Sequence, residues 1–169
     1  TLSGHNTYTG TTTVTSGVLT AGVTSGSGYG AFGVGSAITV NGGTLAIGTY
    51  SETVGTVTVG ANGGSITGSS GVLTGTSYTF NNTSGLTVSA ILGGSGVGLT
   101  QAGNGASTLS GANTYGGGTT LTSGVLLLGV NTVGSLGSIT SSAVGKGTLT
   151  FNGGTISSDG SSGRTLYNV

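Results

Sequence analysis

Hydrophobic and polar residues alternate along most of this chain in short runs that end at glycine, asparagine or serine. Valine, leucine or isoleucine alternates with threonine or serine, and β-branched residues at a period of two favour half-buried β-strands. Apolar residues at the 3.6-residue spacing of a helix are missing, so no helix longer than one turn is expected. The pattern predicts strands such as Thr12–Val14, Val18–Thr20, Ile38–Val40, Thr44–Ile47, Thr53–Val59, Ser77–Phe80, Leu86–Ile91, Thr119–Thr122, Val125–Leu128 and Thr148–Phe151.

The turns between these runs recur at a regular spacing. Asn41-Gly42-Gly43-Thr44 returns as Asn62-Gly63-Gly64-Ser65, and further small-residue turns follow at similar steps. Small residues tolerate the positive φ angles of sharp turns, and a spacing of about 20 residues suits one coil of a β-solenoid with two or three strands. The predicted repeat turn residues, with asparagine as a turn cap or as an amide ladder between coils, are Asn6, Gly17, Asn41, Gly43, Asn62, Gly64, Asn113, Gly124, Asn152 and Gly154.

A longer repeat is superimposed on this period. Thr1–Gly22 and Thr108–Gly129 agree at 16 of 22 positions. The chain is therefore expected to be all-β, one parallel β-solenoid over residues 1–169 with about six to eight coils. The first unit covers about residues 1–107, and an incomplete second unit covers about 108–169. Inward positions are expected at Leu2, Val14, Leu19, Ile38, Leu45, Val57, Ile66, Val88, Leu109, Leu121, Leu126, Leu149 and Ile156.

Two longer segments, which we call excursions, interrupt the regular spacing of the turns, one after each copy of the long repeat: Val23–Ala37 and Val130–Gly147. They follow the same repeat element, so both are predicted to be insertions into one corner of the coil, where solenoids often bind partners. The plainer interpretation is a solvated Gly/Ser loop. Tyr29 and Phe32 lie in the first excursion, as a possible contact loop for a sugar or a neighbouring molecule; the alternative is that they pack back onto the solenoid.

The composition excludes several kinds of function. Glycine supplies 40 of 169 residues, proline and cysteine are absent, and only 2% of residues are charged, with a net charge of zero. Two basic residues cannot neutralise a row of phosphates or hold an anionic membrane surface, and no stretch approaches 18 consecutive apolar residues, so neither nucleic-acid binding nor membrane insertion is expected. Without cysteine there are no disulfides or thiolate metal ligands. A mean hydropathy of +0.32 at zero net charge favours an ordered chain.

The few titratable residues do not form a reactive constellation. His5 is the only histidine and is expected to decorate the surface, because its repeat equivalent is Ala112. Coils about 4.8 Å apart would place Asp159 on the order of 33 Å from His5. Glu52 and Asp159 are about five coils apart, too far for the paired carboxyls of glycoside hydrolysis. We therefore expect no enzyme activity, no catalytic residues, no cofactor and no metal site, although a carbohydrate-active or carbohydrate-binding β-helix stays open as the alternative.

Paired threonines suggest a third, less favoured interpretation. Thr13/Thr15, Thr56/Thr58, Thr120/Thr122 and Thr148/Thr150 would form stacked Thr-x-Thr rows like those of ice-binding solenoids. The rows inferred from sequence are interrupted, and threonine is also an ordinary outward residue of a strand.

The long repeat itself resembles a known family. LSGANTYGGGTTLTSGVLLL and LSGHNTYTGTTTVTSGVLTA are similar to the autotransporter-associated, or passenger-associated, β-strand repeat, with Thr11 in place of the glycine seen at Gly118. The resemblance implies a right-handed parallel β-helix in the secreted passenger of a Gram-negative autotransporter or large surface protein. The expected function is an extracellular or cell-surface structural element, such as a stalk, a filament or an adhesin body, with surface glycans as possible partners.

The two ends are expected to be buried against more β-structure. The sequence begins at Thr1 in the middle of a motif, and Arg164–Val169 is predicted to form a new strand. The sequence is therefore interpreted as a mature portion or a fragment. Few charged residues guard its strand edges against association. The predicted partner is either the flanking solenoid of a longer chain or another copy of the chain, stacked end to end into a filament.

Overall fold

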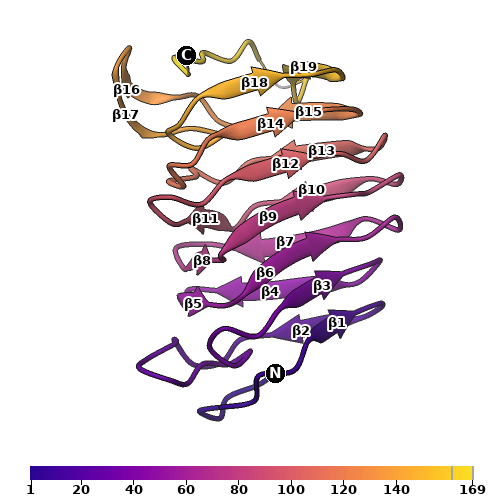
Figure 1. Ribbon diagram of the computed structural model, residues 1–169, viewed down its shortest axis with the longest axis vertical. Helices are drawn as coiled ribbons and strands as arrows, with labels where there is room; N and C mark the ends of the chain where they lie inside the picture. Colours follow the sequence, from indigo (N-terminus) through magenta and orange to yellow (C-terminus); the bar gives the residue numbers. More distant parts are fainter. Residues whose placement is uncertain (161, 169) are drawn as a thin grey trace.

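The computed structural model describes residues 1–160 and 162–168, and in these residues the regular structure consists of strands and turns without a helix. The chain winds repeatedly around one long axis, with the N-terminal coil at one end and the C-terminal coil at the other (Figure 1). Three faces surround a single apolar core. The all-β solenoid expected from the sequence is confirmed.

The first face is a seven-stranded parallel sheet in which each strand pairs with the equivalent strand of the next coil. In most of its strands the first and last residues point toward the core, and a threonine between them points outward. Its strands, in order across the sheet, are β1 (Thr12–Val14), β3 (Ile38–Val40), β6 (Thr56–Val59), β9 (Ser77–Phe80), β12 (Leu99–Gln101), β14 (Thr119–Leu121) and β18 (Leu149–Phe151).

The second face is another seven-stranded parallel sheet, joined to the first at a corner of small residues. Each coil thus adds one strand to both sheets, and seven strands per sheet agree with the six to eight coils expected. The strands are β2 (Val18–Thr20), β4 (Thr44–Gly48), β7 (Gly64–Gly68), β10 (Leu86–Val88), β13 (Ala106–Leu109), β15 (Val125–Leu128) and β19 (Thr155–Ser158).

The third face is shorter and less regular. A three-stranded parallel sheet covers it in the middle coils, formed by β5 (Glu52–Thr53), β8 (Val72–Thr74) and β11 (Ile91–Gly93). The predicted strands Thr53–Val59 and Leu86–Ile91 are each divided here, because the chain turns a corner at Val54-Gly55 and at Ser89-Ala90. Sequence alternation alone did not reveal these corners.

The length of a coil varies along the axis. In the first sheet the two longest steps between neighbouring strands run from Thr12 to Ile38 and from Thr119 to Leu149. The four steps between them are each about 20 residues long, as the turn spacing predicts. The two long steps contain the two excursions. Thr12 and Thr119, which hold the same position of the long repeat, lie five strands apart in this sheet, so the long repeat corresponds to five coils.

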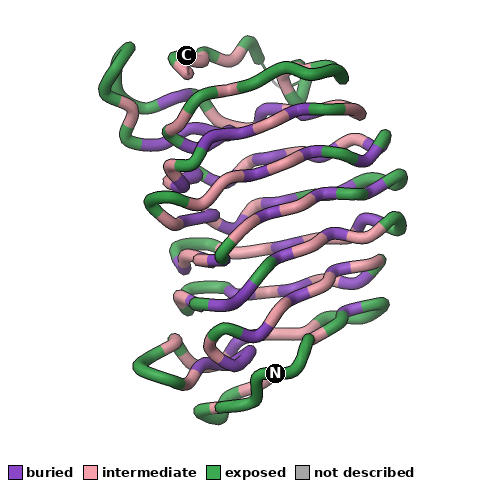
Figure 2. Tube along the Cα trace, viewed as in Figure 1, coloured by how far each residue is buried: buried purple, intermediate pink, exposed green. Residues whose placement is uncertain are grey.

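The core is a stack of apolar layers inside the three faces. Nine of the 13 inward positions expected from the sequence are buried, with exposures of 0 to 4%. The other four, which lie in the outermost coils, are partly buried against the same core: Leu2, Leu19, Leu149 and Ile156. Figure 2 shows the same trend, with buried positions concentrated in the middle coils and exposed positions at both ends.

The C-terminal segment does not form the strand predicted for Arg164–Val169. Arg164–Asn168 has no regular secondary structure, and Val169 lies outside the described residues. Thr165 instead accepts a hydrogen bond from the Thr132 amide at 2.9 Å and donates to Asn131 Oδ1 at 3.0 Å. This segment therefore packs against the second excursion without extending a sheet.

Candidate functional site

Both excursions lie on the third face, as insertions into the same corner. Val23–Ala37 connects β2 to β3, and Val130–Gly147 connects β15 to β18, in each case between a strand of the second sheet and one of the first. The second excursion contains an antiparallel hairpin, β16 (Val133–Ser135) and β17 (Ser138–Ser141), which projects from the solenoid near the C-terminal end (Figure 1).

An asparagine of each long repeat holds the excursion that follows it. Asn6 forms an antiparallel bridge with Gly30, and its side-chain Nδ2 donates to the Ala31 carbonyl at 2.8 Å. Asn113 forms the same bridge with Ser142 and donates to the Ala143 carbonyl at 2.7 Å. The two asparagines therefore anchor the third face, whereas the sequence pattern had placed them among the turn residues.

Each excursion also sends a short buried segment against the core. Ala31-Phe32 and Ala143-Val144 are fully buried, and each is followed by a glycine with positive φ, Gly33 at 69° and Gly145 at 72°. Phe32 is 0% exposed, so it is a core residue and not part of an exposed contact loop. A solvated Gly/Ser loop is likewise wrong for these segments.

Tyr29 and His5 form the more accessible part of the first excursion. The Tyr29 side chain is half-buried and stacks on the exposed His5 ring, with the ring centroids 4.0 Å apart and 20° between the planes. Tyr29 thus packs back onto the first copy of the repeat while keeping part of its surface open. At the equivalent of His5 the second copy has Ala112, which offers no ring for such a stack.

The repeat tyrosines make the same local contact in different surroundings. Tyr8 shares a hydrogen bond with Thr12 Oγ1 at 2.8 Å, and Tyr115 shares one with Thr119 Oγ1 at 2.6 Å. Tyr8 is 37% exposed and Tyr115 is 0% exposed. Burial raises the pKa of the Tyr115 phenol well above its ordinary value, since the charged form would be desolvated.

Comparison with known families accounts for the two stretches that carry the anchoring asparagines Asn6 and Asn113, and not for the excursions themselves. The family model described as the passenger-associated transport repeat matches residues 1–21 and 99–128. Two separate stretches of the chain therefore match the passenger-associated transport repeat. No curated protein and no solved structure matches the chain. The family and the solenoid fold together indicate a structural protein of the passenger type, secreted or exposed at a surface.

The turn glycines of the two repeats occupy one corner of the solenoid. Gly17 and Gly124 both precede a strand of the second sheet, with φ angles of 67° and 73° that a side chain would strain. At the same corner, Asn41 Oδ1 accepts a hydrogen bond from the Asn62 amide of the next coil at 3.0 Å. The remaining predicted turn residues at this corner are Gly43, Gly64, Asn152 and Gly154, with Gly64 at the first position of β7.

Glu52 is a buried carboxylate that the sequence pattern did not identify as such. It is 1% exposed, and its Oε2 accepts hydrogen bonds from Ser25 Oγ at 3.0 Å and from the Ala31 amide at 3.1 Å. Its Oε1 is buried without a hydrogen-bond partner. Burial raises the pKa of this carboxyl, against the opposing effect of the Ser25 hydroxyl and of the nearby Phe32 and Ala31 amide dipoles.

The other charged residues lie far from Glu52. Asp159 follows β19 in the seventh coil and forms a salt bridge with Arg164 at 2.8 Å, whereas Glu52 lies in β5 of the second coil. Five coils correspond to roughly 24 Å along the axis. That separation excludes a glycosidase pair formed by Glu52 and Asp159, because such carboxyls lie about 5–10 Å apart.

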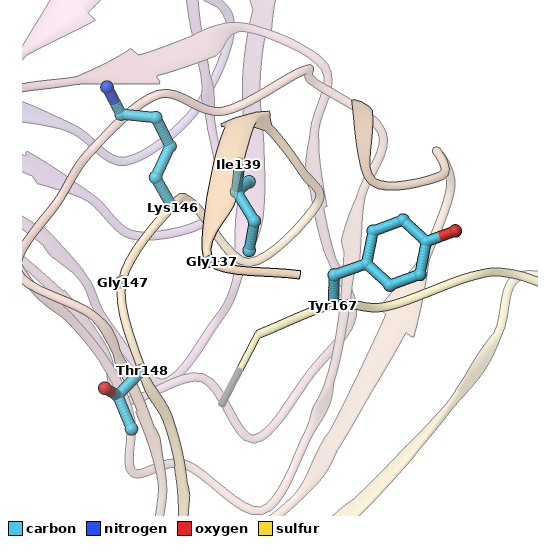
Figure 3. A pocket seen from close by; sticks show the side chains of 6 residues that line it. All are labelled: Gly137, Ile139, Lys146, Gly147, Thr148 and Tyr167. Atoms are coloured by element: carbon cyan, nitrogen blue, oxygen red, sulfur yellow. The ribbon is translucent and has the colours of Figure 1, made fainter. Parts of the chain in front are cut away.

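An open hollow beside the second excursion provides no convergent chemistry. The Lys146 ammonium and the Tyr167 hydroxyl point away from each other and out of the hollow (Figure 3). In the part of the chain that the structure describes, no group of three or more His, Asp or Glu residues could hold a metal ion, and no helix is long and apolar enough to span a membrane. The hollow is lined by Gly137, Ile139, Lys146, Gly147, Thr148 and Tyr167.

A buried polar cluster inside the solenoid was missed by sequence reasoning. Asn82, Gln101 and Ser107 are all 0% exposed. Ser107 Oγ donates to Gln101 Oε1 at 2.7 Å and lies 3.1 Å from Asn82 Oδ1, while Gln101 Nε2 donates to the Gly103 carbonyl at 2.8 Å. Gln101 stands between Phe80 and Leu121 in an otherwise apolar row. The sequence did contain a signal for this cluster, because residues one coil apart occupy the same row and Gln101 falls in a row of apolar residues.

The outer surface of the first sheet carries an uninterrupted row of threonines, which we call the threonine ladder. Sheet register places one threonine of each coil directly beside the threonine of the next, so the expectation of interrupted rows is wrong for this row. The five inner members are half-buried and the two end members are exposed. The ladder consists of Thr13, Thr39, Thr58, Thr79, Thr100, Thr120 and Thr150.

Proposed function

We propose that this chain is a non-catalytic structural segment of an extracellular protein, part of a stalk, a filament or an adhesin body on a Gram-negative bacterium. The observation that carries the proposal is the long, mainly apolar core that runs beneath two seven-stranded parallel sheets and includes the two stretches that match the passenger-associated transport repeat. The ionisable residues support the same conclusion: Glu52 is hydrogen-bonded to the first excursion, and Asp159 is paired with Arg164.

A substrate panel tests the non-catalytic part of this proposal. The chain should release no product from a set of neutral and acidic polysaccharides, and Glu52→Gln should leave that result unchanged. Hydrolysis by the wild-type chain that disappears in Glu52→Gln would instead support the carbohydrate-active alternative. A glycan array compares the wild-type chain with Tyr29→Ala. Sugar binding that is lost in Tyr29→Ala would indicate a third outcome, in which the half-buried Tyr29 helps to bind surface sugars.

We further propose that the solenoid associates through its ends, with another copy of the chain or with flanking solenoid. Phe151 supports this: it occupies an inward position of β18, yet 53% of its surface is exposed, whereas Phe80 and Leu121 in the same row are fully buried. β18 is an edge strand of the first sheet. Another strand laid on β18 would complete its hydrogen bonds and cover the Phe151 ring.

Light scattering on a matched pair of variants tests end-to-end association. Phe151→Lys should reduce the association of the wild-type chain, because a lysine at an inward position opposes docking of another coil. Leu136→Lys is the control, since Leu136 is 68% exposed on the projecting hairpin and belongs to neither seven-stranded sheet. A wild-type chain that remains a 15.8 kDa monomer at every concentration would contradict association with itself.

The threonine ladder favours a second candidate function, adsorption to ice. Its seven hydroxyl and methyl groups repeat at the strand spacing of about 4.7–4.9 Å. Water molecules joined tetrahedrally by hydrogen bonds of about 2.75 Å place second neighbours about 4.5 Å apart, so the two periods differ by about 0.3 Å. The corresponding outward row of the second sheet is mixed and contains Val18 and Leu127, so strand propensity alone does not account for seven threonines.

Ice partitioning distinguishes this candidate from a purely structural surface. The wild-type chain should enter slowly growing ice more than a soluble protein of equal size, and Thr79→Lys should reduce its incorporation several-fold. Thr87→Lys, at an outward position of the second sheet, is the matched control and should behave like wild type. Thr79→Val keeps the shape and removes the hydroxyl, and so provides a milder variant. Equal partitioning of wild type and Thr79→Lys would reject ice binding.

A further inference from the structure

The first excursion is held in place by groups that can change their protonation, which sets it apart from the rest of the solenoid. Ser25 and Ala31, at two points of this segment, both donate hydrogen bonds to Glu52 Oε2. Tyr29, between them, stacks on His5. The chain has only two acidic residues and one histidine, and one of those acids and the histidine contact the same segment.

We propose that residues 24–36 form a flap whose closure over the third face is controlled by the protonation of Glu52. The flap is held most firmly when the carboxyl is neutral and is loosened when the carboxyl is ionised. Opening would expose Phe32 and Ala31, both fully buried in the closed arrangement, and would give Glu52 access to water.

The environment of Glu52 explains why its charge matters. Glu52 pairs in register with Leu73, and Leu73 pairs with Leu92, so the carboxyl occupies a row that is otherwise apolar. Its Oε2 has two donors, but its Oε1 is buried without a partner. A buried oxygen without a partner costs far more free energy when it carries a negative charge than when it is part of a neutral carboxylic acid.

The titratable groups around the flap are His5 and Tyr8 on the adjoining segment, Tyr29 within the flap itself, and Tyr50 just before β5. The basic residues Lys146 and Arg164 belong to the second excursion and the C-terminal segment, in the last coils of the solenoid. No lysine or arginine lies in residues 1–145, so the flap region has no permanent cation to stabilise an ionised Glu52.

The direction of the effect follows from linkage. Burial raises the pKa of Glu52 in the closed arrangement above the value it has when exposed to water. The contribution of Glu52 to closure is therefore complete below the pKa of the exposed carboxyl, and it is lost as the pH rises through the raised pKa. The remaining contacts, which include the Asn6 bridge and the burial of Phe32, do not involve a titrating group and keep the flap largely closed at neutral pH.

The second excursion serves as an internal control. It is anchored by Asn113 in the same way as the first is anchored by Asn6, and Ala143 is buried like Ala31. Among the described residues, the backbone amides of this segment donate to groups other than carboxylates: the Ser142 amide donates to the Asn113 carbonyl, and the Val144 amide donates to Ser142 Oγ. Its opening should therefore be insensitive to pH in the range where a carboxyl titrates.

Hydrogen exchange measured by mass spectrometry on the intact chain tests the proposal. Protection of residues 24–36, expressed relative to residues 141–147 after correction for intrinsic exchange, should fall several-fold from about pH 4 to about pH 8. In Glu52→Gln the ratio should stay constant, because the amide is neutral throughout. If that variant folds poorly by circular dichroism, Glu52→Leu provides a second test, since leucine occupies the same row at Leu73 and Leu92.

A histidine variant separates the two titratable contacts. His5→Ala, which reproduces Ala112 of the second copy, should weaken the flap at every pH and retain the pH dependence. The proposal is overturned if the wild-type ratio does not change with pH, or if its pH dependence persists in Glu52→Gln and disappears in His5→Ala.

Discussion

The two copies of the long repeat have nearly the same sequence but differ in burial. Leu19 is partly exposed and Leu126 is fully buried; Asn6 is half-buried and Asn113 is fully buried. β1 and β2 of the first copy are edge strands, whereas β14 and β15 of the second lie between two neighbouring strands. The motif therefore determines the path of the chain and its local hydrogen bonds, and the coils on either side determine how much each residue contributes to stability.

Truncation of the repeat leucines should reveal this difference most strongly. Leu126→Ala removes a fully buried side chain between two coils and should lower the free energy of unfolding by about 2–5 kcal/mol. Leu19→Ala removes less buried surface and should cost about 1 kcal/mol. Urea unfolding of both variants measures the comparison, and equal losses would show that position in the stack does not matter.

The anchoring asparagines should show the next largest contrast. Asn113→Ala leaves the Ala143 carbonyl and the Leu92 amide without their side-chain partners in a buried site, at a cost of about 2–4 kcal/mol. Asn6→Ala loses one such bond at a half-buried site and should cost about 1 kcal/mol. Thermal unfolding can rank the two, and a greater loss in Asn6→Ala would contradict the argument.

Alkaline unfolding should involve the second copy. Burial raises the pKa of Tyr78 to about 12, and Tyr115 next to it is raised as well. A phenol whose pKa is higher in the folded state contributes stability that is complete below about pH 10 and is lost above it, on the order of 2 kcal/mol. Tyr115→Phe should flatten the alkaline part of the stability profile.

The hydroxyls of Tyr8 and Tyr115 should give the smallest difference in stability between the two copies. At neutral pH Tyr115→Phe breaks a buried chain of hydrogen bonds from Tyr115 through Thr119 to the Val144 carbonyl, which should cost about 1 kcal/mol. Tyr8→Phe removes an exposed bond to Thr12 and should be close to neutral. A double-mutant cycle with Thr119→Val and Thr12→Val would establish whether the two couplings differ.

The periodicities in the sequence were sufficient to predict the solenoid and most of its core. Alternation predicted the strands, and the recurring turns predicted the length of a coil, because both depend on local backbone preferences that repeat. The division of Thr53–Val59 was missed, since Val54-Gly55 turns a corner while continuing the apolar pattern. The prediction for the C-terminal segment was also wrong, because this segment forms hydrogen bonds with the second excursion instead of pairing with a sheet edge.

The candidate site was less predictable, because it depends on contacts between coils of unequal length. The sequence left Phe32 open between an exposed contact loop and packing onto the solenoid, and the structure places its side chain in the core. The sequence pattern did not reveal the burial of Glu52, although Leu73 and Leu92 of the next two coils occupy its row. Aligning the coils by these steps would have identified Glu52 and Gln101 as inward polar residues.

The unequal coils also determine how the molecule should respond to mechanical tension. Strands lie across the long axis, so a pull on one end should peel the chain away one coil at a time. An interior coil of about 20 residues would release roughly 70 Å of extended chain. The coils that contain the excursions, from Thr12 to Ile38 and from Thr119 to Leu149, should release longer lengths near the two ends. The molecule would then extend in discrete steps, with an excursion-bearing coil among the first to yield whichever end is pulled.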